Sequence, residues 1–227
     1  MTDQTPSNLT QPLTPRQIKN RDALMDAAEA LFASYGYHAV SVREITGLAK
    51  VRVAEVNDLF GGKENLFYEV IRRRATVVNE QREQRLAAVD KQQPREDQVR
   101  ALVAAFFDPL LEVSAVNDGW RNYLRLVNQM VGSRSPILLN VVEFYNPISQ
   151  KFLMAIYQIY PEIGMPRILR HWQFILATYF SIFADNYRVN SLSQGKVQSS
   201  QFKEAYEEAT TFIEFGLESL LSGSESK

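Results

Sequence analysis

The sequence predicts an all-α fold, and three observations carry that prediction. From residue 14 onward, apolar residues recur with the spacing of amphipathic helices. No segment shows the sustained polar–apolar alternation of a strand, and no repeat of about 20–50 residues is visible. The chain has 227 residues, of which 45% are hydrophobic and 22% charged. This is globular composition, and the length suits one large domain or two small ones.

The first helix is predicted over residues 15–35. Thr14 is a favourable N-cap, the proline after it suits the first helical position, and Gln17 completes a capping box. Gly36 ends the helix. Residues 1–13 are polar and contain two prolines, so we expect them to form a disordered tail.

Two short helices and a long one are predicted next. Ser41 and Glu44 form a second capping box, which begins the first short helix. The second short helix follows Val51 and ends near Leu59, where two glycines break the pattern. A long helix over residues 63–88 then begins.

The rest of the chain is predicted to hold five more helices after a polar connection at residues 90–97. Pro147 is expected to kink or split the third of them, and residues 191–200 are expected to form a loop. The predicted helices cover residues 96–114, 119–132, 136–160, 166–189 and 199–222.

The composition excludes several kinds of chemistry. The absence of cysteine rules out disulfides, thiolate nucleophiles and cysteine-ligated zinc. The two histidines, His38 and His171, are far apart, and there are no paired carboxylates, so we expect neither an enzyme nor a metal or cofactor site. His171 is interpreted as a core or pocket residue. The N-terminus lacks the features of a signal peptide, and the stretch from Trp172 to Ala184 is too short to span a bilayer. We therefore expect a soluble, cytoplasmic protein.

Residues 41–60 carry the most informative pattern, which is two short amphipathic helices with a tight connection near Ala49-Lys50-Val51. This layout is typical of a helix-turn-helix, in which the first helix braces the second and the second enters the major groove of DNA. The predicted helix at 15–35 and the start of the long helix would complete a small three-helix core.

In this region the sequence resembles the TetR-type transcriptional regulators, from Arg21 to Phe67. Residue type and spacing agree over about 47 positions, so the resemblance is specific, although it covers only the first third of the chain at residue level. The matching residues are Ala27, Ala28, Leu31, Phe32, Gly36, Tyr37, Ser41, Val42, Arg43, Glu44, Ile45, Ala49, Val51, Val56, Phe60, Gly61, Lys63, Glu64, Leu66 and Phe67.

The resemblance implies an all-helical homodimer of two-domain protomers. A helix-turn-helix domain at 14–62 would bind palindromic operator DNA, and a domain at 89–227 would dimerise and bind a small-molecule effector, with the long helix linking the two. Effector binding would change the spacing of the recognition helices, which fit an operator only when they lie about 34–36 Å apart. We therefore expect a ligand-responsive transcriptional regulator that acts as a repressor.

Several positions depart from the family pattern. The departures are Lys50 in place of glycine, Arg52 and Glu55 in place of small or polar residues, Asn57 in place of a phosphate-binding tyrosine, Leu59 in place of histidine, and Asp58. An aspartate near phosphate opposes binding, although nearby lysine and arginine residues can offset it. These departures motivate an alternative, a protein of TetR fold that binds a ligand but has weak or lost DNA binding.

Five residues of the second short helix and its start are candidates for reading DNA. Arg52 can reach guanine O6 and N7, or contact phosphate or solvent instead. Glu55 can accept from cytosine N4 or pair with Arg52, and we favour the pairing. Val53 and Ala54 are small enough to approach a thymine methyl group, or they face solvent. Asn57 can contact phosphate or adenine, with phosphate favoured.

Four further residues are candidates for contacting DNA, and two of them, Lys63 and Lys19, are expected to contact its backbone. Lys63, at the start of the long helix, is predicted to form a phosphate clamp with the exposed backbone amides there. Arg43, Lys50 and Lys19 are the other candidate contacts. Residues 14–74 hold ten lysine and arginine residues against eight carboxylates, in a chain of net charge −1, so affinity must depend on the placement of these side chains. The run from Arg72 to Arg74 is interpreted as solvated and packed rather than as DNA-binding.

Aromatic residues are dense in the C-terminal half, and most are interpreted as core, with some lining an effector cavity. Few charges lie among them, which favours a mostly apolar effector such as an aromatic compound or an acyl chain. Arg121 and Arg125 are the candidates to hold a carboxylate. The candidate cavity residues are Trp120, Tyr123, Val127, Phe144 and Trp172.

The last two predicted helices have broad apolar faces, which two protomers can bury together in a four-helix bundle. Internal packing alone is the alternative. The candidate dimerisation residues are Phe180, Phe183, Phe212, Ile213, Gly216, Leu217 and Leu220.

Overall fold

The computed structural model describes residues 12–131 and 134–222, without the side chains of residues 131, 138, 139 and 217–222. These residues fold into α-helices and short 3-10 helices, and no strand occurs among them, so the predicted all-α class is confirmed. The chain divides between Arg73 and Arg74 into two compact units. Apart from its last two residues, the predicted tail at 1–13 lies outside the described residues.

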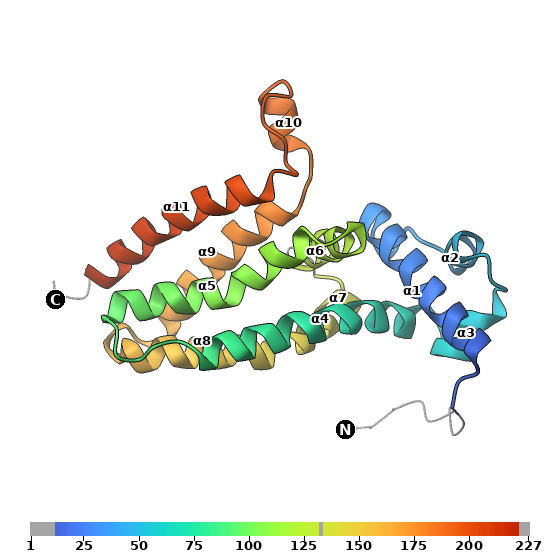
Figure 1. Ribbon diagram of the computed structural model, residues 1–227, viewed down its shortest axis with the longest axis horizontal. Coiled ribbons are helices and arrows are strands. Elements are labelled where there is room, and N and C mark those ends of the chain that lie inside the picture. Colours follow the sequence, from blue (N-terminus) through green and yellow to red (C-terminus); the bar gives the residue numbers. More distant parts are fainter. Residues whose placement is uncertain (1–11, 132–133, 223–227) are drawn as a thin grey trace. The chain divides into compact units, whose positions relative to one another are not determined.

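The first unit holds three helices and the beginning of a fourth (Figure 1). They are α1 (Pro15–Tyr35), α2 (Val42–Ala49), α3 (Ala54–Phe60) and α4 (Lys63–Ala87), and α4 continues into the second unit. Helix α1 packs against α2 and α3. The buried residues of this unit include Leu24, Ala28, Phe32, Ile45, Val56, Leu66, Phe67 and Val70.

Capping boxes begin α1 and α2, as the sequence predicts. The side chain of Thr14 accepts from the amide of Gln17 at 3.3 Å, and Gln17 Oε1 accepts from the amide of Thr14 at 2.9 Å. Ser41 and Glu44 make the same reciprocal pair at 3.3 and 2.7 Å. These bonds satisfy amides that have no partner within the helix. Local sequence chemistry therefore sets where both helices start.

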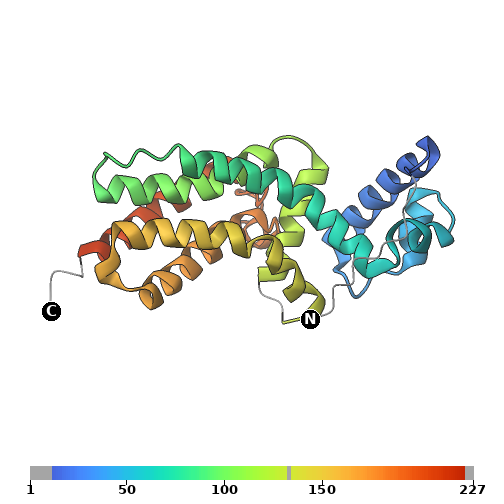
Figure 2. The same ribbon diagram turned by 90° about the horizontal axis from the view of Figure 1, so that it is seen from below.

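The second unit holds the remainder of α4 and all later helices. These are α5 (Arg95–Ser114), α6 (Asp118–Val131), α7 (Pro136–Val141), η1 (Val142–Phe144), α8 (Asn146–Ile159), η2 (Pro161–Ile163), α9 (Met165–Phe183), α10 (Arg188–Leu192) and α11 (Phe202–Ser222). Helix α5 packs against α6, α8 and α11, and α9 packs against α6, α8 and α11. Figure 2 shows α5 and α8 running along each other.

An aromatic cluster forms the centre of the second unit. Phe106 on α5 lies edge-on to Phe152 on α8 and to Trp172 on α9, with ring centroids 5.1 and 4.8 Å apart. Phe107 stacks on Tyr179 at 4.2 Å. Such pairs are favourable beyond their buried area, so these rings hold α5, α8 and α9 together.

Two predicted helices differ in the structure. The helix predicted over 166–189 ends at Phe183, because Asp185 and Tyr187 adopt left-handed backbone angles (φ 45° and 58°) that interrupt the helical path before α10. The helix predicted over 136–160 is split as expected, and Pro147 lies in the first turn of α8.

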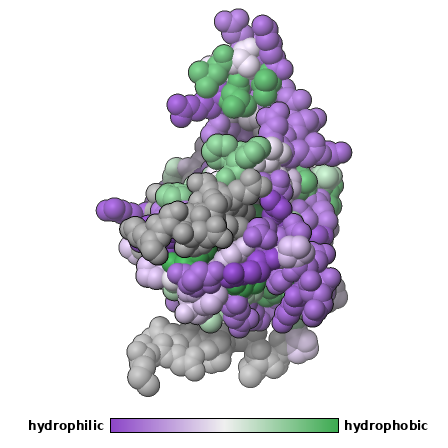
Figure 3. Space-filling view, turned by 90° about the vertical axis from the view of Figure 1, so that its left-hand side faces the viewer, coloured by the Kyte–Doolittle hydropathy of each residue, from purple (hydrophilic) through white to green (hydrophobic). Residues whose placement is uncertain are grey.

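The segment around α10 exposes apolar side chains. Val189, Leu192 and Val197 are each exposed, Leu192 to 77%. Figure 3 shows hydrophobic side chains gathered near the top of the molecule, where α10 lies. Its base is anchored to the unit, because Asp185 pairs with Arg125 and accepts from Ser199 Oγ at 2.6 Å. Within the described residues no helix is both long and apolar enough to cross a membrane.

Candidate nucleic-acid interface and ligand cavities

The turn between α2 and α3 is closed by Lys50, which has a left-handed backbone (φ 56°, ψ 41°). Its amide bonds to the carbonyl of Gly47 at 3.3 Å, and the amide of Val51 bonds to the carbonyl of Thr46 at 3.1 Å. A glycine adopts this conformation freely, whereas an L-residue has a cost of about 1 kcal/mol. The helix-turn-helix therefore tolerates lysine in its turn at a modest loss of stability.

Helix α3 has one buried and one exposed face. Val56, Leu59 and Phe60 are buried in the first unit, while Ala54, Asn57 and Asp58 are exposed. Gly61 ends the helix in a left-handed conformation at φ 74°. Leu59, which stands in place of the family's histidine, belongs to the core and therefore leaves the exposed face of α3 unchanged. Asp58 is exposed and adds a negative charge to that face.

Arg52 is held in place at the start of α3. Its Nη2 donates to Glu55 Oε1 at 3.0 Å, as the favoured interpretation of Glu55 predicts. The Arg52 side chain is 73% exposed, while that of Glu55 is 8% exposed. The hydrogen bond from Arg52 is the largest cause of the lowered pKa of Glu55. A guanidinium has five N–H donors, so this bond orients Arg52 and leaves most of its donors available.

The other candidate DNA-contacting residues of α1, α2 and α3 are accessible. Lys19 on α1, Arg43 on α2 and Lys50 in the turn are exposed cations. Val53 and Ala54 are also exposed, at the start of α3. Direct contact of these side chains with DNA remains a prediction, and it is sterically open for each of them.

Lys63 is engaged within the first unit. Its Nζ donates to the carbonyl of Tyr37 at 2.6 Å and lies 4.2 Å from the centroid of the Tyr37 ring. Partial burial lowers the pKa of Lys63. Both contacts link the first turn of α4 to the loop after α1. They give Lys63 an anchoring role within the first unit, and its contact with a phosphate stays a prediction.

We expect Lys63→Met to lower the free energy of unfolding by about 1–3 kcal/mol, because it removes a charge-assisted hydrogen bond and a cation–π contact. Urea denaturation measures this, with Lys19→Met as the exposed control, for which we expect a change below about 0.5 kcal/mol. Equally small changes in the free energy of unfolding for both variants would show that Lys63 does not anchor the fold and would favour a role as a surface phosphate contact.

The run of three arginines is occupied by protein contacts. Arg72 and Arg21 both pair with Glu69 at 2.6 Å, and Arg73 pairs with Asp26 at 2.8 Å. The Arg74 guanidinium lies 4.5 Å from the centroid of a tryptophan ring, that of Trp120. The run is interpreted from the sequence as solvated and packed rather than DNA-binding, and the ion pairs of Arg72 and Arg73 were not predicted.

The two arginines predicted to hold a carboxylate already have acidic partners. Arg121 pairs with Asp118 at 3.4 Å and donates to the carbonyl of Ser114 at 3.1 Å. Arg125 pairs with Asp185. Because these contacts use their guanidinium groups, both residues serve to join elements of the second unit.

One of the predicted cavity residues, Val127, lines a cavity of the second unit, and two others contact residues of its wall. Val127 lines an interior cavity of about 220 Å³, whereas Trp172 belongs to the aromatic cluster. Tyr123 lies beside that cavity, since its hydroxyl is 2.9 Å from the hydroxyl of Tyr145 in the wall. Phe144 is half-buried, and its carbonyl accepts from Asn79 at 2.7 Å. The cavity is lined by Arg82, Phe106, Val127, Met130, Val141, Val142, Tyr145, Asn146, Ser149, Leu176 and Phe180.

Arg82 is the charged residue among the cavity residues that were not predicted from the sequence. It lies on the long helix α4, where a solvated arginine would be unremarkable, yet its side chain is 1% exposed. Its Nε donates to the carbonyl of Phe106 at 2.8 Å and its Nη1 to Asn79 Oδ1 at 3.2 Å. Only the three-dimensional packing of α4 against α5 identifies it.

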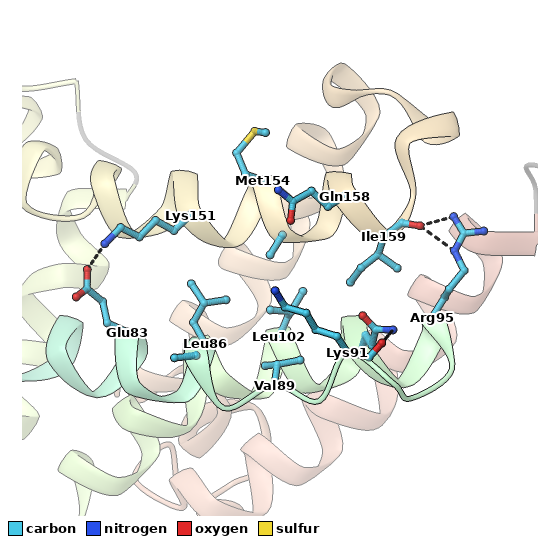
Figure 4. A pocket seen from close by; sticks show the side chains of 13 residues that line it. Glu83, Leu86, Val89, Lys91, Arg95, Leu102, Lys151, Met154, Gln158 and Ile159 are labelled. Atoms are coloured by element: carbon cyan, nitrogen blue, oxygen red, sulfur yellow. Dashed lines mark hydrogen bonds and ion pairs between the residues drawn. The ribbon is translucent and has the colours of Figure 1, made fainter.

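A larger, open cleft of about 830 Å³ lies between the end of α4, α5 and α8 (Figure 4). Glu83 and Lys151 form an ion pair across one end, and Arg95 binds the carbonyl of Ile159 at the other. Leu86, Val89 and Leu102 give it an apolar floor (Figure 4). None of the predicted ligand-binding residues lines this cleft.

The predicted dimerisation residues divide into buried and exposed sets. Phe180, Phe183 and Ile213 are at most 8% exposed within one protomer, so they are unavailable to a partner. Phe212 is 70% exposed and Gly216 is exposed. The side chains of Leu217 and Leu220 lie outside the described residues. Two exposed aromatic residues were not predicted, namely Phe174 on α9 and Phe215 on α11.

Family comparisons agree with this architecture. Residues 24–70 match the family model of bacterial regulatory proteins of the tetR family, and residues 104–216 match the model of the tetracyclin repressor-like C-terminal domain. The chain therefore belongs to the TetR family of transcriptional regulators, which are not enzymes. No curated protein sequence matches the chain.

Solved structures of the family share the fold at low sequence identity. SmeT, the repressor of the Stenotrophomonas maltophilia multidrug efflux pump SmeDEF, is 16% identical with a TM-score of 0.56, over 85% of this chain and 87% of that one. A TetR-family regulator from Bordetella parapertussis is 18% identical with a TM-score of 0.54, over 85% and 93%. FadR from Bacillus subtilis, solved in complex with stearoyl-CoA, is 16% identical with a TM-score of 0.51, over 83% and 97%.

Proposed function

We propose that this protein is a ligand-responsive transcriptional repressor, which binds palindromic operator DNA as a homodimer in the cytoplasm and is released by a mostly apolar effector. The observation that carries the proposal is the exposed face of α3. Arg52, Ala54 and Asn57 lie there in a helix-turn-helix whose opposite face is buried. A second helix with such an exposed face is what the major groove accepts.

The proposed DNA contacts combine base reading with backbone positioning. Arg52, oriented by Glu55, is placed to donate to guanine O6 and N7. Val53 and Ala54 suit contact with a thymine methyl group, and Asn57 suits a phosphate. Lys19, Arg43 and Lys50 would add backbone contacts, with Lys63 anchoring the fold from within.

The proposed dimer surface is the exposed apolar part of α9 and α11. Phe212 and Phe215 are each 70% exposed and Phe174 is 62% exposed, so α9 and α11 expose three large aromatic side chains that a partner could cover. Helices α9 and α11 pack together in one protomer, so two copies would form a four-helix bundle. A two-fold symmetric dimer matches the symmetry of a palindromic operator.

The proposed route of regulation runs along α4. This helix continues from the first unit into the second, where its residues Asn79 and Arg82 lie at or beside the interior cavity. A ligand in the cavity would therefore act directly on the helix that begins in the DNA-binding unit. The related FadR structure with stearoyl-CoA supports a ligand-binding role for this fold.

A gel-shift assay with the purified dimer and the DNA upstream of its own gene tests the proposal. We expect a discrete shifted band that unlabelled specific DNA competes away and that high salt weakens. A folded dimer that shifts no DNA at low salt would favour the second candidate, a TetR-fold ligand-binding protein without DNA binding.

Asp58 is the observation behind that second candidate, because it places a negative charge on the exposed face of α3. We expect Asp58→Asn to raise DNA affinity about 10- to 30-fold at low salt, since each protomer loses about 1 kcal/mol of repulsion. Fluorescence anisotropy measures this, with Glu143→Gln, an exposed carboxylate of the second unit, as the control. An unchanged affinity would show that Asp58 lies away from the phosphates.

A further inference from the structure

Arg82 is a buried cation without an acidic partner. Its side chain is 1% exposed, and no carboxylate of the described residues pairs with it. Its protein contacts are neutral: the carbonyl of Phe106, the amide oxygen of Asn79 and the face of the Phe106 ring, whose centroid is 3.8 Å from the guanidinium carbon. By contrast, Arg121 and Arg125 each have an aspartate.

A charge in this position is costly unless something compensates it. Burial lowers the pKa of Arg82 to about 10, so the guanidinium remains charged at neutral pH. Removing an ion from water costs several kcal/mol in a folded protein, and neutral hydrogen-bond acceptors offset only part of that. A buried arginine that the protein leaves without a counter-ion is therefore suited to receive one from a ligand.

Arg82 lines the cavity and keeps one group of donors that the described residues do not use. Nε and Nη1 are used by the protein, whereas Nη2 makes no hydrogen bond within the described residues. Nη2 has no hydrogen-bond partner among the described residues, yet it is not fully enclosed by protein atoms, so it is accessible from open space. The open space that Arg82 borders is the interior cavity of about 220 Å³.

The remaining walls define the rest of the ligand. They are mostly apolar and come from α5, α6, α7, η1 and α9, through Phe106, Val127, Met130, Val141, Val142, Leu176 and Phe180. Tyr145 adds a hydroxyl that is paired with the hydroxyl of Tyr123 at 2.9 Å. The volume is below the range of about 300–1,000 Å³ typical of sites for drug-sized ligands, which favours a short or single-ring compound.

We propose that this cavity binds a small apolar monocarboxylate, with its carboxylate on Arg82 Nη2 and its apolar body between α5, α6 and α9. One unpaired cation matches one negative charge, and no other lysine or arginine lines the cavity to hold a dianion. This inference rests on the proposed function in that such an acid would be the effector. It assigns the carboxylate to Arg82, in place of Arg121 and Arg125.

Calorimetric titration of the full-length protein with acids and their neutral amides tests the assignment. Phenylacetate and hexanoate are the acid probes, and phenylacetamide and hexanamide are their matched controls. We expect each acid to bind at least about tenfold more tightly than its amide, because a charge-assisted hydrogen bond is lost in the amide. Equal affinities, or no binding by either acid at millimolar concentration, would overturn the proposal.

Three variants locate the binding. Arg82→Met should remove the preference for the acid over the amide, and Arg82→Lys should retain part of it. Val127→Phe leaves Arg82 intact but fills the cavity, so it should weaken acid and amide alike. Circular dichroism and the DNA affinity of the unliganded variants establish that they are folded. An acid preference that survives in a folded Arg82→Met variant contradicts the assignment.

The titration is independent of DNA, so it separates this inference from the proposed function. If the acids bind through Arg82 but leave DNA affinity unchanged, the site stands and the regulatory role fails. Suppose instead that the protein binds DNA, that only neutral compounds release it, and that Arg82→Met behaves like the unsubstituted protein. In that case the regulatory role stands and the acid site fails.

Discussion

Arg52→Ala is expected to weaken operator binding at least about 30-fold, because the dimer loses a bidentate base contact worth about 1–3 kcal/mol in each of two half-sites. The substitution removes a side chain that is already oriented, because the nearly buried Glu55 binds the Arg52 guanidinium at 3.0 Å. Fluorescence anisotropy over a series of salt concentrations measures both affinity and its salt dependence. Arg52→Lys keeps the charge but loses the planar fork, so it should restore only part of the affinity.

The salt dependence decides between the two contacts open to Arg52. If Arg52 reads a base, Arg52→Ala lowers affinity and leaves the slope of log affinity against log salt concentration almost unchanged. If Arg52 contacts a phosphate instead, the substitution reduces the magnitude of that slope by about 0.9 per protomer. Arg188→Ala, at an exposed position of α10 and so outside the proposed dimer surface, is the control. An affinity within twofold of the unsubstituted protein would remove Arg52 from the interface.

The double variant Phe212→Glu/Phe215→Glu is expected to be monomeric and to bind a palindromic operator at least about 100-fold more weakly. Two exposed aromatic side chains of α11 are replaced by charges that a dimer interface would have to bury. Two linked half-site contacts reinforce each other, and a monomer loses that reinforcement. Sedimentation velocity reports the mass, and anisotropy reports the affinity.

Val116→Glu is the matched control for the dimer prediction, because Val116 is 61% exposed and lies after α5, outside α9 and α11. It should leave both mass and affinity unchanged. The double variant should also keep its affinity for a single half-site, since the first unit is intact. A dimer that persists in the double variant would place the interface on another surface.

The parts of the structure set by local chemistry were predictable from the sequence. The capping boxes at Thr14 and Ser41 fix helix starts through residues three positions apart. The pair between Arg52 and Glu55 also joins residues three positions apart, at the start of α3. Pro147 lies in a first helical turn, where its ring is compatible with the backbone. Each depends only on neighbours in the sequence.

The candidate sites depend on packing between distant segments, which local pattern does not determine. Helix α9 is apolar on several sides, so periodicity did not separate buried Phe180 and Phe183 from exposed Phe174. The partner of Arg125 is 60 residues away, and the acceptor for Lys63 is a backbone carbonyl. Arg82 was not predicted as a site residue, because nothing in the sequence of α4 indicates that α5 covers it.

Hydroxyl-radical footprinting of the full-length dimer on the DNA upstream of its own gene tests the central claim most directly, which is that two α3 helices read an operator. We expect two protected half-sites related by a two-fold axis, with centres about 34–36 Å apart or a multiple of that spacing. We also expect Arg52→Ala to abolish protection of both half-sites at the same protein concentration. Uniform protection, or no protection by a folded dimer at low salt, would show that the two α3 helices do not read an operator.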